Sequence, residues 1–191
     1  MKKILLLLIL FFGSISSLNA EISRIVSGNK NAKITIIAYE SLTCSHCATF
    51  HRDIFPKLKK EYIDTGLAKI EFRHFPLDIQ AFNASKVSQC RNDGQSKILH
   101  SLFANQQKWV KGSTIEKANE NLQKFLDNEG FNIDLEKCTN NKEIEDFVLN
   151  DRINGVKKFK INATPTVIIN NQKFEKPLNF KNLKKALEKL I

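Results

Sequence analysis

The sequence predicts an α/β fold in which an all-helical domain is inserted into a small sheet. An apolar, β-branched run at residues 34–39 leads directly into Cys44-Ser45-His46-Cys47, and a helical pattern follows these residues. Strand patterns then return only at Thr166, after a long stretch with helical spacing. A strand that ends at two cysteines three positions apart, where a helix begins, is typical of a redox site.

Residues 1–20 have the pattern of a secretory signal peptide. A positive start at Lys2 and Lys3 precedes an apolar run over 4–12 that is too short to span a bilayer, and small and polar residues extend to Ala20. We expect cleavage after Ala20, with an uncleaved membrane anchor as the alternative. The mature protein is then expected in the periplasm or another extracytoplasmic space, where disulfides form and persist.

Residues 21–77 are expected to form the first half of the fold. A short edge segment and a turn precede the strand at 34–39. The helix that follows the cysteines carries apolar residues at every fourth position and contains Pro56, which should kink it. A second strand follows at 68–75, with side chains of alternating character.

Residues 78–159 form the predicted insertion. Amphipathic helical patterns occur there in four places, near 80–91, 95–110, 114–128 and 140–158. Residues 160–191 are expected to complete the fold with strands at 166–170 and 172–175 and a helix at 180–191.

Composition allows an ordinary core and argues against nucleic-acid binding. The hydrophobic content of 42% is sufficient for a buried core in 191 residues. The net charge is +10, but the lysines are scattered and no basic stripe alternates with aromatic residues. We therefore interpret the charge as a solvated surface and expect no nucleic-acid partner, with an anionic partner or membrane surface as the alternative.

The order of elements, β-α-β, a helical block and β-β-α, resembles the thioredoxin superfamily and, within it, the DsbA-like thiol:disulfide oxidoreductases. The motifs that carry the resemblance are the strand at 34–39, Cys44-Ser45-His46-Cys47, Phe50-His51, Gly66, Arg73-His74-Phe75-Pro76-Leu77 and Ala163-Thr164-Pro165-Thr166. It extends over residues 25–190. It implies a thioredoxin fold with an inserted all-helical domain.

Cys44 is the candidate nucleophile of this motif. At a helix N-terminus its thiolate would be stabilised by unpaired backbone N–H groups and by the helix dipole. His46 would add a hydrogen-bond donor and, when protonated, a positive charge. Cys47, one turn further along the helix, is the candidate resolving cysteine. A purely structural disulfide, or half of a zinc site, is the alternative for the pair.

The resemblance also implies that Thr164-Pro165 has a cis peptide bond and faces the two cysteines. The Thr164 backbone would then pair with an extended substrate segment, as in other cases of β-strand addition.

Two positions differ from the DsbA-like pattern. Ser45 stands where relatives often have proline, so a redox potential cannot be carried over. Ala38 stands where many relatives have a buried acid that manages the proton of the resolving cysteine. Glu40 has the same strand parity as Ala38 and could replace that acid, but we expect it to be solvated at the strand end.

Cys90 and Cys138 are expected to form a structural disulfide within the insertion, with free buried thiols as the alternative. A four-cysteine zinc site is disfavoured because these two lack a paired spacing. The other histidines and the tryptophan have ordinary structural interpretations: His51 as a partly exposed helix residue, His74 as a packed strand residue, His100 on the insertion surface and Trp109 in the core.

The sequence as a whole predicts an exported thiol:disulfide oxidoreductase that introduces disulfide bonds into reduced or unfolded secreted proteins. This chemistry needs no metal or organic cofactor, and the resemblance implies reoxidation by a membrane partner linked to quinone. A disulfide isomerase or reductase on the same fold is the first alternative, and a non-catalytic binding protein or holdase is the second. The short segment before the strand at 34–39 lacks the dimerisation domain of periplasmic isomerases, which favours a monomeric oxidase.

Overall fold

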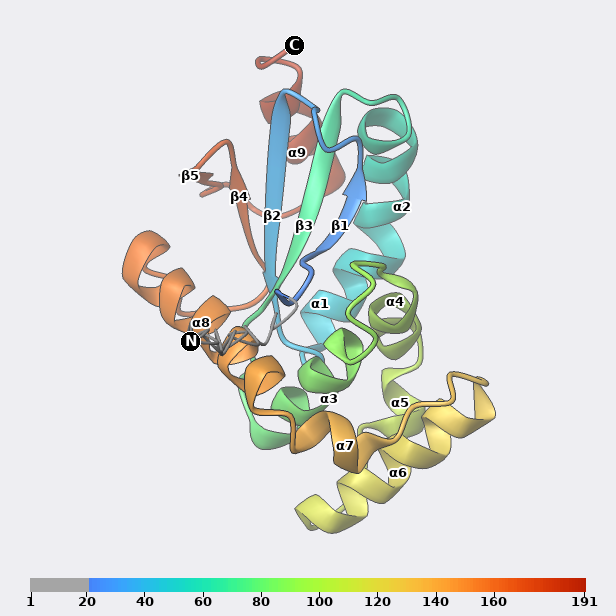
Figure 1. The fold of residues 1–191 in the computed structure, drawn as a ribbon. Coiled ribbons are helices and arrows are strands. Elements are labelled where there is room, and N and C mark those ends of the chain that lie inside the picture. Colours follow the sequence, from blue (N-terminus) through green and yellow to red (C-terminus); the bar gives the residue numbers. More distant parts are fainter. Residues whose placement is uncertain (1–20) are drawn as a thin grey trace, which may run out of the picture.

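The computed structural model describes residues 21–191, so the predicted signal peptide lies outside the described residues. Within this range a five-stranded sheet forms the centre of the molecule, in the order β1-β3-β2-β4-β5 (Figure 1). Its strands are β1 (Ile25–Gly28), β2 (Ile34–Glu40), β3 (Ala68–His74), β4 (Thr166–Ile169) and β5 (Gln172–Lys173). β2 and β3 are parallel, and the other neighbouring pairs are antiparallel. The predicted strand order along the chain is confirmed.

One helical segment, from Ser45 to Ile63, begins directly after Cys44 and contains Cys47. It consists of α1 (Ser45–Thr49), η1 (Phe50–Ile54), α2 (Phe55–Leu58) and η2 (Lys59–Ile63), where η1 and η2 are π-helical turns. Pro56 lacks a backbone N–H, and the wider turn η1 directly before it accommodates this loss. The sequence predicts a kink at Pro56, and the structure has a π-helical turn just before it.

Six helices connect β3 to β4 in the described chain. They are α3 (Ile79–Gln89), α4 (Lys97–Ala104), α5 (Gln106–Trp109), α6 (Ile115–Asn128), α7 (Leu135–Thr139) and α8 (Lys142–Phe159), and α9 (Phe180–Leu187) follows the sheet. The helix predicted at 95–110 is divided at Asn105, whose φ of −123° is not helical. Helix α7 was not predicted, and it begins where the Asp134 side chain accepts the backbone N–H of Lys137.

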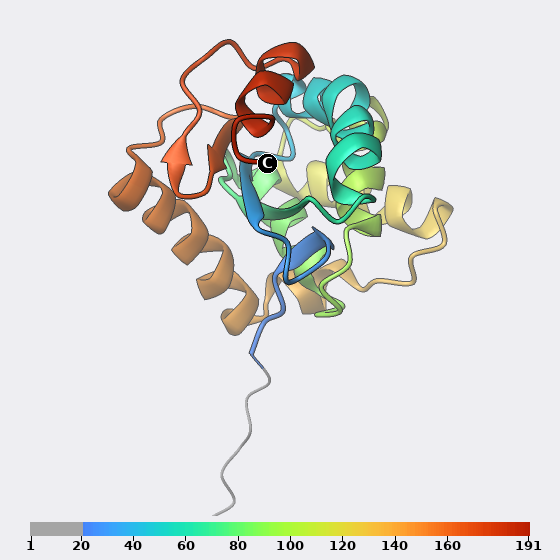
Figure 2. The same cartoon turned by 90° about the horizontal axis from the view of Figure 1, so that it is seen from above.

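Helices cover both faces of the sheet (Figure 2). Ile36 and Ala38 of β2 belong to the core shared with the active-site helical segment and α9. Ile37 and Tyr39 pack on the other face with Phe159 of α8. Because β2 is buried on both faces, its sequence is apolar at consecutive positions rather than alternating.

Helix α8 approaches β2 closely. A side chain at Gly155 would place its Cβ 2.9 Å from Cε1 of Tyr39, so glycine permits the contact. Arg24 donates to the buried Asp151 carboxylate at 2.8 Å, and the same carboxylate accepts the backbone N–H of His74 at 3.1 Å. These contacts attach the last helix of the insertion to the sheet. No helix within residues 21–191 is long and apolar enough to cross a membrane.

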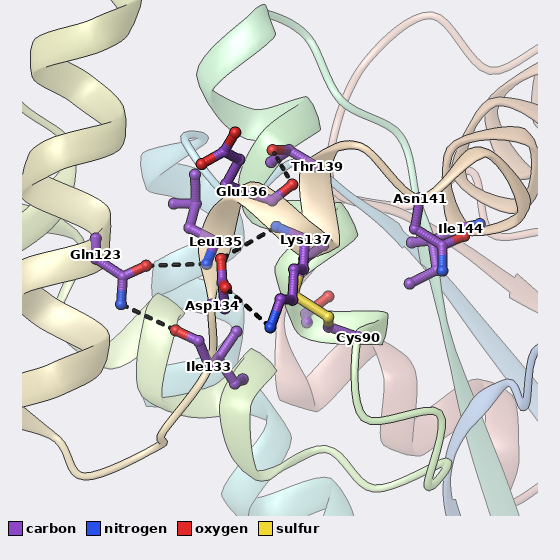
Figure 3. Close-up of a disulfide and its surroundings, with 12 residues drawn as sticks. Cys90, Gln123, Ile133, Asp134, Leu135, Glu136, Lys137, Thr139, Asn141 and Ile144 are labelled. Carbon is purple, nitrogen blue, oxygen red and sulfur yellow. Dashed lines mark hydrogen bonds and ion pairs between the residues drawn. A yellow bond between two sulfur atoms is a disulfide. The ribbon is translucent and has the colours of Figure 1, made fainter.

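A disulfide joins Cys90, which directly follows α3, to Cys138 of α7, with their Cα atoms 5.4 Å apart. Figure 3 shows how Gln123 of α6 contacts the segment that leads into α7. Its amide donates to the carbonyl of Ile133 at 2.9 Å and accepts the backbone N–H of Leu135 at 2.9 Å. The disulfide and these hydrogen bonds together hold α7 against α3 and α6.

Candidate active site

Cys44 caps the N-terminus of α1. Its backbone is extended, with φ −77° and ψ 120°, and its carbonyl accepts the N–H groups of Cys47 at 3.1 Å and Ala48 at 3.2 Å. This is the arrangement in which the unpaired N–H groups of a helix surround the capping residue.

Side chains of the insertion hold the loop that precedes α1. The Gln106 amide donates to the carbonyls of Leu42 at 2.8 Å and Cys44 at 3.0 Å. The Thr43 hydroxyl donates to the Asp78 carboxylate, which caps α3, at 2.6 Å. The insertion therefore positions the cysteine pair. The sequence did not indicate Gln106, because a single glutamine 62 positions from Cys44 belongs to no recognisable motif.

The surroundings of the half-buried Cys44 sulfur lower the pKa of its thiol to about 5. The largest cause is the hydrogen bond from the Cys47 side chain, and Thr164 and the backbone N–H groups of Cys47 and His46 add to it. Burial opposes this shift. Cys44 is consequently a thiolate at neutral pH, the form that attacks a disulfide.

Cys47 has the opposite environment. It is fully buried, and burial raises the pKa of its thiol, as do the hydrogen bond to Cys44 and the negative charge of Glu40. Both cysteines are free thiols in this structure. Two thiols in adjacent turns of one helix therefore differ sharply in acidity.

The Thr164-Pro165 peptide bond is cis, and its loop lies against Cys44. The Thr164 carbonyl is 3.4 Å from Sγ of Cys44. Strand β4 begins directly after this loop, so the loop connects the sheet to the reactive sulfur. The ring of His46, in contrast, is on an exposed residue, and the effect of His46 on Cys44 comes from its backbone N–H.

A thioredoxin family model matches residues 20–189 of the chain. Among solved structures, alpha-DsbA1 of Wolbachia pipientis superposes with a TM-score of 0.77 at 31% sequence identity, covering 87% of this chain and 90% of that one. The chain belongs to the DsbA-like branch of the thioredoxin family. The predicted thioredoxin fold is therefore confirmed.

Curated relatives support this assignment to the DsbA-like proteins. A putative protein-disulfide oxidoreductase of Rickettsia bellii is 32% identical over 169 residues, which are 87% of this chain. The chain spans 64% of that relative's length. Disulfide bond formation protein D of Bacillus subtilis is 28% identical over 181 residues, covering 86% of this chain and 75% of that protein.

The DsbA-like site contains a buried acid, and our expectation that Glu40 is solvated was wrong. Glu40 is 4% exposed, because the β2 end at which it lies is covered by the active-site helical segment. Its Oε2 lies 2.8 Å from Nε2 of His51. Burial raises the pKa of the Glu40 carboxyl, the nearby His51 lowers it, and the charge of Cys44 raises it.

The prediction for His51 was also wrong. His51 is 9% exposed rather than partly exposed, because the turn η1 directs both Phe50 and His51 inward. His100 is half-buried on the insertion, where it stacks on Phe55 with ring centroids 4.7 Å apart. Its Nδ1 lies 2.9 Å from Nδ1 of His51. The predictions for His74 and Trp109 were confirmed, because both are buried.

The site offers no obvious place for a metal ion. Within residues 21–191, no three or more His, Cys, Asp or Glu side chains are grouped so that they could hold one.

Proposed function

We propose that this chain is an extracytoplasmic thiol:disulfide oxidoreductase that introduces disulfide bonds into secreted proteins through Cys44 and Cys47. The observation that carries the proposal is the contrast between the two thiols. The pKa of Cys44 is lowered to about 5 at the helix N-terminus, whereas that of the buried Cys47 is raised. Such a pair contains one reactive sulfur and one protected sulfur, which a purely structural disulfide does not require.

The proposed reaction begins with the oxidised enzyme, in which Cys44 and Cys47 are joined. A substrate thiolate attacks Sγ of the accessible Cys44, and the electron pair of the broken disulfide goes to Cys47. A second substrate thiolate then attacks the substrate sulfur of the mixed disulfide, and Cys44 leaves as its thiolate. The substrate gains a disulfide, and the enzyme is left with two reduced cysteines.

The low pKa of Cys44 favours this direction. A stabilised thiolate makes Cys44 a good leaving group and stabilises the reduced enzyme relative to its disulfide form. The Thr164 carbonyl, 3.4 Å from Sγ of Cys44, is placed where an extended substrate segment could pair with the loop backbone.

The remaining parts of the proposal come from the resemblance. Residues 1–20 would direct export and be removed after Ala20, and a quinone-linked membrane partner would reoxidise the cysteine pair. Substrates would be reduced or unfolded secreted proteins, and the protein would act as a monomer without a metal or organic cofactor. The B. subtilis relative is named a disulfide bond formation protein, which agrees with this role.

Refolding assays test the proposal. The oxidised protein lacking residues 1–20 is mixed with a fully reduced substrate, and in a second assay the reduced protein, whose Cys44 thiolate can attack a disulfide, is mixed with a scrambled, fully oxidised substrate; Cys44→Ser is the control in both. We expect disulfides to form in the reduced substrate and the scrambled one to remain largely unchanged. Rapid rescue of the scrambled substrate alone would identify an isomerase, and binding without exchange would identify a holdase.

A further inference from the structure

Two buried side chains, Glu40 and His51, and the half-buried His100 form a continuous polar chain behind the cysteine pair. Oε2 of Glu40 lies 2.8 Å from Nε2 of His51, and Nδ1 of His51 lies 2.9 Å from Nδ1 of His100. They come from β2, η1 and α4, so three separate elements converge to build the chain. The second carboxylate oxygen of Glu40, Oε1, is buried without a hydrogen-bond partner among the described residues.

The donors and acceptors of these three side chains fix which nitrogen of each histidine ring carries the proton. When the Glu40 carboxyl is ionised or carries its proton on Oε1, His51 donates its Nε2–H to Oε2, and neutral His51 then has a lone pair on Nδ1. That lone pair accepts Nδ1–H from His100, which leaves the lone pair of His100 on Nε2. Each ring thus receives a proton on one nitrogen and releases one from the other.

His100, the outer end of this polar chain, lies at a pocket. A pocket of about 520 Å³ is lined by both histidines together with Ala48, Thr49 and Arg52 of the active-site segment and Phe103 of α4. This volume is large enough for several water molecules. Glu40 forms the inner end of the polar chain, and it is close enough to Cys47 for the Glu40 charge to raise the pKa of the Cys47 thiol.

We propose that His51 and His100 carry protons between Glu40 and the solvent in this pocket, so that the buried Cys47 can gain and lose its proton during disulfide exchange. The inference rests on the proposed exchange at Cys44 and Cys47. It makes the two histidines positioning and proton-transfer residues, since neither contacts the reacting sulfurs.

The proton steps balance as follows. When a substrate thiolate breaks the Cys44–Cys47 bond, Cys47 leaves as a thiolate and takes the proton of the Glu40 carboxyl. Glu40 takes the Nε2 proton of His51, His51 takes the Nδ1 proton of His100, and His100 takes a proton from water. Reoxidation of the enzyme moves one proton outward along the same atoms, which restores the starting tautomers.

The acidities of the groups agree with this role. Burial raises the pKa values of Cys47 and Glu40, so both hold a proton more readily than exposed groups do. Burial lowers the pKa of His100 to about 3, and the charges of His51 and Lys59 contribute. His100 is therefore neutral at pH 7. Only a neutral ring can accept a proton on one nitrogen while it releases a proton from the other. The titratable and charged groups that face these three side chains are Cys44, Cys47, Lys59 of η2 and Arg52 at the pocket.

The test measures exchange at the cysteine pair directly. The oxidised protein is reduced by a small dithiol in a stopped-flow experiment between pH 6 and 8, comparing wild type, His100→Gln and His100→Ala. Gln107 also lines the pocket, so Gln107→Ala serves as the control. We expect His100→Gln to slow the protonation-limited step at least tenfold, since a positioned proton-transfer group typically contributes about 10²–10⁴-fold. Imidazole should accelerate His100→Ala by entering the pocket, and it should not affect wild type or Gln107→Ala.

The outcomes separate this inference from the proposed function. A folded His100→Gln with wild-type rates throughout the pH range would overturn the relay, as would a slow His100→Ala that imidazole does not accelerate. If Gln107→Ala slows exchange as much as His100→Gln, the effect belongs to pocket shape, and the relay is also overturned. If the His100 variants show the expected effects with dithiol but the wild-type protein does not oxidise reduced proteins, the proposed function alone is refuted.

Discussion

Removal of the Cys90–Cys138 disulfide should destabilise the protein strongly. The bond closes a loop with a sequence separation of 48, which contains α4, α5, α6 and part of α7. For a loop of this length, the loss of chain entropy in the unfolded state corresponds to about 4 kcal/mol. We therefore expect Cys90→Ala/Cys138→Ala to lower the free energy of unfolding by about this amount.

Urea unfolding can be followed by the fluorescence of Trp109, which is the only tryptophan of the chain and is fully buried. If the free energy of unfolding falls by roughly 2 kcal/mol per molar urea, the midpoint should decrease by about 2 M.

Gln123→Ala provides the control for this experiment. It removes the two hydrogen bonds that hold the same segment but leaves the disulfide intact. The expected loss is about 1 to 2 kcal/mol, because two backbone groups lose a partner. If the double cysteine variant lost no more than Gln123→Ala, the loop-closure argument would be refuted, and packing of α7 alone would account for its position.

Three further predictions concern the active site. Cys47→Ala should accumulate a mixed disulfide between Cys44 and a reduced substrate protein, visible by mass spectrometry after acid quenching; a failure to trap it would show that Cys47 does not resolve the intermediate. Glu40→Gln should change the pH dependence of stability. The raised pKa of Glu40 means that its contribution to folding is complete below its ordinary pKa of 4.5 and is lost as the pH rises toward the native value. Wild type should therefore lose stability relative to Glu40→Gln above pH 4.5, by at most about 1.4 kcal/mol per pH unit, and parallel stability curves would contradict the raised pKa. Gln106→Ala should lower the free energy of unfolding by about 1 to 3 kcal/mol and slow exchange, since two carbonyls of the loop lose their donor, whereas unchanged exchange would show that the loop holds Cys44 without it.

The sequence predicts the sheet and the reactive pair well because each depends on local patterns. Strand β2 is apolar at consecutive positions, and β3 alternates, as strands buried on two faces and on one face do. Cys44 lies at the start of a helix, and the neighbouring Cys47 side chain and backbone N–H groups of the same segment lower the pKa of its thiol. These features need no knowledge of distant contacts.

The polar chain behind the site could not be predicted in this way. His51 points inward because η1 is a π-helical turn, whereas regular helical spacing from Phe50 places His51 at the side. Its partner His100 is 49 positions away in another helix, so their contact depends on how the insertion packs. Glu40 is buried because the active-site helical segment covers the end of β2, although its place at the strand end suggested solvent.

The short helix α7 escaped prediction for a different reason. Five residues are too few to show helical periodicity, and its cap at Asp134 was the only local signal. Asn105 similarly divides a pattern that looked continuous over 95–110. Both features lie in the insertion, where tertiary contacts decide how the helices are divided.

The acidity of Cys44 tests the central claim most directly. The ultraviolet absorbance of the thiolate can be titrated in the reduced protein, with Cys44→Ser as the control that removes the transition. The structure predicts a midpoint at about pH 5. A midpoint near about 8.5, the ordinary value for a cysteine, would contradict the assignment of Cys44 as an activated nucleophile.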